Sequence, residues 1–231
     1  MKLYDIDGKE HKDNSFILSA ISRVICIGDS VTAGAGTGVL GEYLHKYAYP
    51  TRLAKMTNWT IENAGFGGIT ALGWWQDAFA DYDFTNYQMA IIELGYNGGL
   101  TDTLETDCTG NDYTAFADTN TGAYCKIIEG IKAANPNALI VLIISSAMQT
   151  SGDTYKVIGD IGAKYSLPVI NLTDPTYIDL NVPEYHDNAG DYVHFNALGY
   201  IAKAKYIHAK LTDYFIKNQS VLTTTIITSD T

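Results

Sequence analysis

Four short segments of the chain bring together nucleophilic, basic and hydrogen-bonding residue types in a fixed order. They are G-D-S at Gly28–Ser30, N-A-G-F-G-G-I-T at Asn63–Thr70, E-L-G-Y-N at Glu93–Asn97, and D-Y-V-H-F-N-A-L-G at Asp191–Gly199. Serine, histidine and aspartate are the residue types that nucleophilic acyl transfer requires. The first candidates for chemistry are therefore Ser30, His194 and Asp191.

A neutral serine is a weak nucleophile and needs a base within hydrogen-bond reach, which a third group must orient. Asp191 and His194 are three residues apart, just before the start of a predicted helix. At this spacing the Asp191 carboxylate can accept the Nδ1 proton of His194, so that Nε2 faces outward towards Ser30. The sequence therefore predicts a Ser30–His194–Asp191 triad.

A tetrahedral oxyanion needs hydrogen-bond donors that are already in place. The backbone N–H of Ser30, the backbone N–H of Gly68 in a glycine-rich turn, and the side-chain amide of Asn97 are the candidates. Each of them follows the end of a predicted strand, and ligands of open α/β sheets bind beyond the carboxyl ends of the strands. We expect the three donors to converge there.

Short apolar runs alternate with helical patterns along the chain. The expected strands are 23–28, 60–63, 88–94, 138–145 and 168–172, and the expected helices are 41–57, 71–80, 122–134, 154–165 and 196–217, the last with Asn196 as N-cap. Continuous apolar runs such as VICI and ALIVLII are typical of parallel strands that helices cover on both faces. The pattern predicts a three-layer α/β domain.

The four segments, in this order and spacing, resemble the conserved blocks of the SGNH (GDSL-type) hydrolase family. That family has GDS, N-x-x-x-x-G-D-T, G-x-N-D and D-x-x-H-P-N-x-x-G, and the resemblance covers about residues 23–210. It implies a flavodoxin-like α/β/α fold with a five-stranded parallel sheet, and a serine esterase or acylhydrolase. The family's triad would fall on Ser30, Asp191 and His194, and its oxyanion donors on Ser30, Gly68 and Asn97.

Two positions depart from the family pattern. Ile69 stands where an Asp usually follows the oxyanion glycine, and Gly98 stands where an Asp usually follows the block asparagine. Both are supporting positions that fix loop geometry, so the departures bear on the oxyanion donors more than on the triad.

For the substrate we expect a small-molecule or glycan ester, with short acyl groups, such as acetyl, on a carbohydrate. No long apolar stretch suggests a lid or an acyl-chain channel, and the chain holds 17 Tyr against 7 Phe. Amphipathic rings suit sugar faces. The candidate rim residues are Asp29, Tyr96, Trp74 and Trp75. The alternatives are a lysophospholipase or thioesterase, and a catalytically silent glycan-binding module of a larger surface or phage-type protein.

No cofactor or metal is expected. The glycine run Gly34–Gly38 has the spacing G-x-G-x-G and does not follow its strand directly, as a dinucleotide fingerprint would. His186, Asp187, Asp191 and His194 have the ligand types of a metal site, but two of them are the expected triad pair. The sequence favours a metal-independent esterase.

Composition and charge bound the partners. With 15 basic and 26 acidic residues the formal charge is −11, and no Lys/Arg cluster offers a face for nucleic acid. The longest apolar run, Ala138–Ile144, is far short of the about 20 residues of a membrane span, and the first twenty residues carry no signal-peptide core. The chain is expected to be either a cytosolic protein or an exported domain cut from a longer protein.

The expected organisation is a polar leader at 1–20, the hydrolase domain at 21–217, and a tail or linker at 218–231. Cys26 is expected in the core, and Cys108 and Cys125 are expected as two free thiols, with a disulfide as the alternative. The stretch 101–121 is acidic and Thr/Asn-rich. It is expected to be a long loop, either a solvated insertion or a substrate-selecting rim presenting Tyr113 and Phe116.

Overall fold

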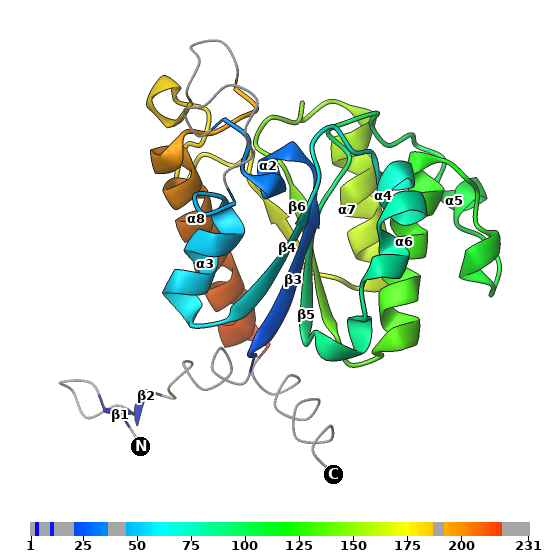
Figure 1. Ribbon diagram of the computed structural model, residues 1–231, viewed down its shortest axis with the longest axis horizontal. Helices are drawn as coiled ribbons and strands as arrows, with labels where there is room; N and C mark the ends of the chain where they lie inside the picture. The colour runs from blue at the N-terminus through cyan, green and yellow to red at the C-terminus, as the bar shows by residue number, and fades with distance from the viewer. Residues whose placement is uncertain (1–2, 5–9, 12–20, 37–44, 187–191, 219–231) are drawn as a thin grey trace.

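The computed structural model describes residues 3–4, 10–11, 21–36, 45–186 and 192–218 (Figure 1). Within these residues the main body is a parallel sheet with helices on both faces, and a short antiparallel pair, β1 (Leu3–Tyr4) and β2 (Glu10–His11), precedes it. The three-layer α/β/α fold expected from the sequence is confirmed. Residues 219–231, predicted as a tail or linker, lie outside the described residues.

The sheet of the described chain has five parallel strands in the order β4-β3-β5-β6-β7. Their bounds are β3 Arg23–Gly28, β4 Thr60–Gly65, β5 Met89–Glu93, β6 Leu139–Ile144 and β7 Val169–Asn171. All five coincide with predicted strands. The strands β3, β5 and β6 form because their apolar residues are buried between two helical layers. The edge strand β4 is more polar, and only its last two residues, Ala64 and Gly65, are buried. This is the flavodoxin-like order, in which ligands bind near the switch point beside the first strand.

Helices on the two faces enclose two separate cores. The face on the left of Figure 1 holds α3 (Tyr49–Thr57) and α8 (Ala197–Lys217), and the other face holds α4 (Ala71–Asp77), α6 (Asn120–Ala134) and α7 (Asp153–Tyr165). Alternate residues of β5 point into opposite cores: Met89 and Ile91 face α3 and α8, and Ala90 and Ile92 face α4, α6 and α7. The predicted helices are confirmed, except that the first begins at Tyr49 and not at 41: residues 45–48 form a turn, and residues 41–44 lie outside the described residues.

Short helical turns occupy the connections. They are α2 (Ser30–Ala33), α5 (Leu104–Asp107), and the 3-10 turns η1 (Phe79–Asp81), η2 (Phe84–Asn86), η3 (Tyr113–Ala115) and η4 (Pro183–Tyr185). The turn α2 lies at the carboxyl end of β3 (Figure 1), which places Ser30 at that edge of the sheet.

The segment 101–121 is a packed insertion, and the expectation of a simple loop is wrong. Its apolar residues Leu104, Cys108 and Phe116 are buried in the core that α4, α6 and α7 cover. Phe116 is therefore not a rim residue. Tyr113 packs edge-on against Trp75, with ring centroids 6.3 Å apart.

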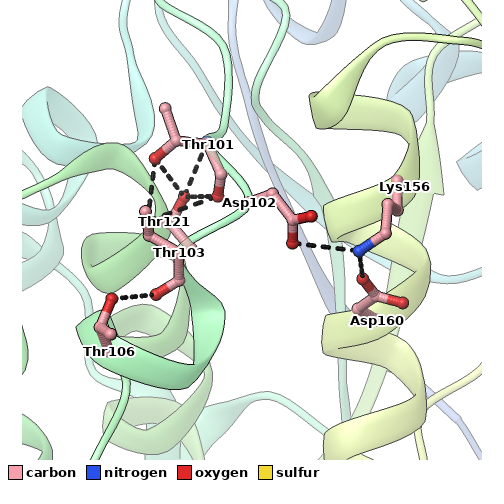
Figure 2. Close-up of polar contacts among 7 residues, drawn as sticks. All are labelled: Thr101, Asp102, Thr103, Thr106, Thr121, Lys156 and Asp160. Carbon is pink, nitrogen blue, oxygen red and sulfur yellow. Dashed lines mark hydrogen bonds and ion pairs between the residues drawn. The ribbon is translucent and has the colours of Figure 1, made fainter.

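Polar contacts at two places hold the base of this insertion. The Thr121 hydroxyl accepts a hydrogen bond from the backbone N–H of Thr101 at 3.0 Å and donates to the Thr101 carbonyl at 2.9 Å (Figure 2). The Lys156 ammonium of α7 bridges Asp102 at 3.0 Å and Asp160 at 2.7 Å. The insertion is thus fixed to both α6 and α7.

All three cysteines are buried free thiols. Cys26 belongs to the core covered by α3 and α8, as expected, and Cys108 and Cys125 belong to the other core. The Cys108 thiol lies 3.6 Å from the carbonyl oxygen of Thr121. Among the described residues, no helix has the length and apolar character needed to cross a bilayer.

Trp74 is a core residue, and its assignment to the rim is wrong. Its side chain is fully buried, its indole N–H donates to the Ala64 carbonyl at 3.0 Å, and its ring stacks on Tyr82. The neighbouring Trp75 is half-buried and packs on Phe79, with ring centroids 4.5 Å apart. Trp74 belongs to the core that α4, α6 and α7 cover, and Trp75 packs against its edge.

We expect Trp74→Phe to lower the free energy of unfolding by about 1–3 kcal/mol, because the Ala64 carbonyl loses a buried donor and the ring loses volume. Urea unfolding followed by circular dichroism measures the change. Trp75→Phe, at a half-buried ring, is the matched control with a smaller loss. Equal losses in the two variants would contradict the assignment of Trp74 as the buried member of the pair.

Candidate functional site

Ser30 is placed by the turn that ends β3. The strand stops at Gly28, Asp29 serves as N-cap of α2, and the Asp29 carboxylate accepts a hydrogen bond from the Val31 N–H at 3.0 Å. Ser30 is the first residue of α2 and is 9% exposed. The turn therefore holds the serine hydroxyl at the carboxyl edge of the sheet.

His194 meets Ser30 across 164 residues of chain. Its Nε2 lies 3.0 Å from the Ser30 Oγ, which is hydrogen-bond distance. The segment that carries it is anchored on its carboxyl side by Asn196, the predicted N-cap of α8, whose side chain accepts from the N–H groups of Leu198 and Gly199. The structure thus brings together the predicted nucleophile and the predicted base.

The absence of a side chain at Gly36 leaves space for His194, a role that was not predicted from the sequence. A β-carbon at Gly36 would lie 2.7 Å from Cβ of His194, and the residue has a φ of +86°, which favours glycine. Close by, the Tyr200 hydroxyl donates to the Ala35 carbonyl at 2.8 Å. The spacing of the glycine run 34–38 does not fit a dinucleotide-binding loop. Its described part instead caps α2 at Gly34 and lets the chain pass His194.

The predicted third member of the triad, Asp191, lies outside the described residues. The described residue before that gap, His186, is 6% exposed, and both of its ring nitrogens face carbonyl oxygens: Nδ1 that of His194 at 2.8 Å and Nε2 that of Leu180 at 3.0 Å. A neutral imidazole donates only one of these two hydrogen bonds, and the ring lies between the His194 backbone and the segment around Leu180.

Two of the candidate oxyanion donors, Gly68 and Asn97, lie on the loops that follow the two strands flanking β3. Gly28 pairs with Gly65 of β4 on one side and with Glu93 of β5 on the other. Gly68 follows β4 by three residues and Asn97 follows β5 by four, so their loops start beside the turn that carries Ser30. The Asn97 side-chain amide donates to the Ile69 carbonyl at 3.2 Å, and this bond joins the two loops.

Ile69 and Gly98, the two departures from the family pattern, have different surroundings in the structure. Ile69 supplies its backbone carbonyl to Asn97, and its side chain packs against the core that α4, α6 and α7 cover. At Gly98 an added β-carbon would lie 2.7 Å from the Asn120 amide nitrogen, and the Asn120 side-chain oxygen accepts from the Leu72 N–H. The backbone of the Asn97 loop thus approaches the start of α6 closely.

Exposed aromatic rings lie on the same loops. Tyr96, predicted for the rim, is 41% exposed. Phe66, two residues before Gly68, is 41% exposed, and Tyr192, two residues before His194, is 44% exposed. Sequence reasoning missed Phe66 and Tyr192, although their position beside block residues was a usable signal. Asp29 is 2% exposed and caps α2, so its assignment to the rim is wrong.

A cluster of buried charges lies beneath the Ser30 turn. Glu93 and Lys203 form an ion pair of 2.5 Å between β5 and α8, and the two side chains are 2% and 0% exposed. Burial raises the pKa of Asp29 to about 6, and the nearby charge of Glu93 adds to the rise. Neither Glu93 nor Lys203 was singled out from the sequence as a charged pair.

Among the described residues, no group of three or more His, Cys, Asp and Glu side chains is arranged to hold a metal ion. Asp187 and Asp191, two members of the metal cluster weighed from the sequence, lie outside those residues.

Residues 26–202 match the GDSL-like Lipase/Acylhydrolase family. Because the match spans most of the chain, the protein belongs to this family of acylhydrolases, as the sequence resemblance implied. No curated protein sequence is similar enough to the chain to be matched.

Solved structures share the fold at low sequence identity. A two-domain esterase active on acetylated mannans has 18% identity and a TM-score of 0.61, with 83% of this chain and 48% of that chain covered. The esterase EstA from Pseudoalteromonas sp. has 16% identity and a TM-score of 0.59, with 84% and 98% covered. A carbohydrate esterase family 2 enzyme from Corynascus thermopiles has 17% identity and a TM-score of 0.56, with 85% and 67% covered.

The raised pKa of Asp29 predicts a pH-dependent effect on stability. The folded chain holds the Asp29 proton up to about pH 6, whereas the unfolded chain releases it near pH 4. Between these values the folded state binds more protons, so this group's contribution to stability falls as pH rises. We expect Asp29→Asn, which keeps an acceptor for Val31, to gain about 1–3 kcal/mol relative to the parent between pH 4 and pH 7.

Urea unfolding of both proteins at several pH values measures this gain. Asp112 is the matched control, because it caps the exposed turn η3 in the same way and its hydrogen bonds to Thr114 lower its pKa. Its contribution to stability is present above the unfolded-state pKa and is lost as pH falls, so Asp112→Asn should change with the opposite sign. A pH-independent difference for Asp29→Asn would contradict the buried, proton-retaining carboxyl.

Proposed function

We propose that the protein is a serine esterase in which Ser30 is the nucleophile and His194 the general base. The observation that carries the proposal is the 3.0 Å approach of the Ser30 Oγ to the His194 Nε2. A serine and a histidine at this distance form the activated pair that ester hydrolysis requires. Membership of the acylhydrolase family supports the same chemistry.

In the proposed reaction the Ser30 Oγ attacks the ester carbonyl carbon as His194 Nε2 takes the hydroxyl proton. The resulting oxyanion accepts hydrogen bonds from the Ser30 and Gly68 N–H groups and from the Asn97 amide. His194 then returns the proton to the departing alcohol, which leaves an acyl group on Ser30. His194 then takes a proton from water as the water oxygen attacks the acyl carbon, and it passes that proton to the Ser30 Oγ as the acyl–Oγ bond breaks and the acid leaves. Asp191 is proposed to accept the Nδ1–H of His194.

For the substrate we propose short acyl groups, acetyl first, on a carbohydrate. Phe66, Tyr96 and Tyr192 support this, because they present exposed rings on the loops that carry Gly68, Asn97 and His194, and aromatic faces suit sugar rings. Two fold neighbours are a carbohydrate esterase and an esterase active on acetylated mannans. Neither nucleic acid nor a membrane is proposed as a partner.

Hydrolysis of p-nitrophenyl esters of increasing chain length, together with acetate release from acetylated polysaccharides, tests the substrate class. Preference for acetate supports the proposal. Preference for long chains would favour a lysophospholipase or thioesterase. No turnover of any ester would favour a silent glycan-binding module and contradict the proposed reaction.

Ser30→Ala should abolish ester turnover while leaving the unfolding free energy close to that of the parent, because the hydroxyl is lost without a change in packing. A fluorophosphonate probe should label the parent once per chain, at Ser30, and should not label the variant. One fold neighbour, EstA, is described as inhibited by monoethylphosphonate, a related reagent.

The matched control is Ser146→Ala, because Ser146 is a buried serine whose hydroxyl has no hydrogen-bond partner among the described residues. It should keep both turnover and labelling. EDTA should leave turnover unchanged. Turnover that persists in Ser30→Ala, or that EDTA abolishes, would overturn the mechanism. In this mechanism only the neutral imidazole of His194 can act as the base.

Asn97→Ala should lower kcat by about one to three powers of ten with a smaller change in KM, because an oxyanion contact counts most in the transition state. The variant also loses the bond to the Ile69 carbonyl, so urea unfolding must show that the fold is kept. Asn135→Ala, which removes an amide bonded to the Tyr87 carbonyl away from Ser30, is the matched control. A raised KM at unchanged kcat would assign Asn97 to ground-state binding instead.

A further inference from the structure

The Glu93–Lys203 ion pair is a feature that the proposed reaction does not use. The Lys203 ammonium and a Glu93 carboxylate oxygen are 2.5 Å apart, and both side chains are almost completely removed from solvent. Burying two charges carries a large desolvation cost, which the attraction between them only partly offsets. A pair of this kind is therefore weak evidence for stability and calls for another role.

The surroundings hold the cation more completely than the anion. Lys203 lies over the Tyr49 ring at 5.1 Å and over the Phe195 ring at 5.3 Å, both within the range of cation–π attraction. Glu93 uses one carboxylate oxygen for Lys203, and its buried Oε2 has no hydrogen-bond partner in the part of the chain that the structure describes. The negative charge of Glu93 is thus balanced mainly by Lys203.

Several titratable groups face this pair from different elements. The charge of Glu93 raises the pKa of four neighbouring groups: Asp29, Cys26, Tyr49 and Tyr124. The charges of Lys203 and His194 act in the opposite direction on the pKa of Asp29. Burial raises the pKa of the Cys26 thiol and of both phenols, so these three stay neutral at neutral pH. Among the described residues, the groups that can carry a charge near Ser30 in this set are Asp29, Glu93, Lys203 and His194. Asp191, which we propose as the partner of His194 and which lies outside those residues, adds a further carboxylate.

The pair also sits where the reacting segments meet. Glu93 is the last residue of β5, pairs with Gly28 beside the Ser30 turn, and precedes Asn97 by four residues. Lys203 lies in α8, the helix that follows His194, and touches the ring of Phe195, the residue next to the base. One ion pair thus connects the segments that carry the nucleophile, the base and an oxyanion donor.

We propose that Glu93 and Lys203 are positioning residues of the esterase, which join the Asn97 strand to the His194 helix and cancel the buried carboxylate charge beneath the Ser30–His194 pair. This inference rests on the proposed function. A merely structural pair would matter only for folding. A charge-cancelling pair must also set the pH at which His194 gains its proton, with a direction that depends on which partner is removed.

The two single substitutions give opposite expectations. Lys203→Met leaves the Glu93 carboxylate unbalanced and favours the His194 cation, so protonation should move to higher pH. Glu93→Gln leaves the Lys203 ammonium unbalanced and should move it to lower pH. Each shift is expected at about 0.3–1 pH unit, which is smaller than the effect of a charge within about 4–6 Å of a titrating group. The double variant and Lys203→Arg should stay close to the parent.

The readouts are the pH profile of kcat/KM for p-nitrophenyl acetate and the pH titration of the His194 Cε1–H resonance by NMR, assigned with a His194→Gln variant. The resonance reports without turnover, so it separates this inference from the proposed function. A parent that hydrolyses no ester overturns the function, whereas the titration still decides the charge effect. Lys126→Met is the matched control, because Lys126 is also a buried lysine paired with an acid, on α6 over the opposite face.

Opposite shifts in the two single variants, restored in the double variant, support the inference. Shifts of the same sign, or none in any variant, overturn it and leave a structural pair. A shift in Lys126→Met as large as that in Lys203→Met would also overturn it. Should Lys203→Met fail to fold, Glu93→Gln and the double variant still decide, because a downward shift that the double variant reverses is specific to the charge.

Discussion

The candidate site depends on the register of three parallel strands. Gly28 of β3 lies opposite Gly65 of β4 and Glu93 of β5, so the chain leaves all three strands at the same edge. The loops that follow carry Ser30, Gly68 and Asn97, and a shift of one residue in either pairing would separate them. The apolar residues of β3 and β5 are buried on both faces of the sheet, so the packing of the two helical layers holds these strands in place. The geometry of the candidate site thus depends on core packing.

His194 reaches this edge from the other end of the chain and relies on a different set of contacts. The carbonyl of His194 is held by His186, the residue after it packs on Lys203, and Asn196 begins α8. Packing of α8 against α3 and the sheet positions His194, the proposed base, while the β3–α2 turn positions Ser30, the proposed nucleophile. Asp29, Glu93 and Lys203 are buried charged residues between the Ser30 turn and α8. Their charges bear both on the stability of the fold and on the electrostatics of the candidate site.

The sequence predicted the strands, the main helices and the Ser30–His194 pairing, because apolar runs, an N-cap at Asn196 and spaced motifs are local signals. Features that depend on long-range packing were missed. Glu93 and Lys203 are 110 residues apart, and no pattern marks them as partners. The Thr-rich composition of 101–121 concealed Leu104 and Phe116, which turn into the core. In the tandem Trp74–Trp75, composition alone does not indicate which ring is buried.

The central claim is that Ser30 carries the acyl group during turnover, and direct observation of that intermediate tests it best. The parent is mixed with p-nitrophenyl acetate, quenched in acid within the first turnover, digested and analysed by mass spectrometry. We expect a burst of about one p-nitrophenol per chain and an acetyl group on the peptide that contains Ser30. A burst without acetyl on that peptide, or acetyl on another residue that persists in Ser30→Ala, would contradict it.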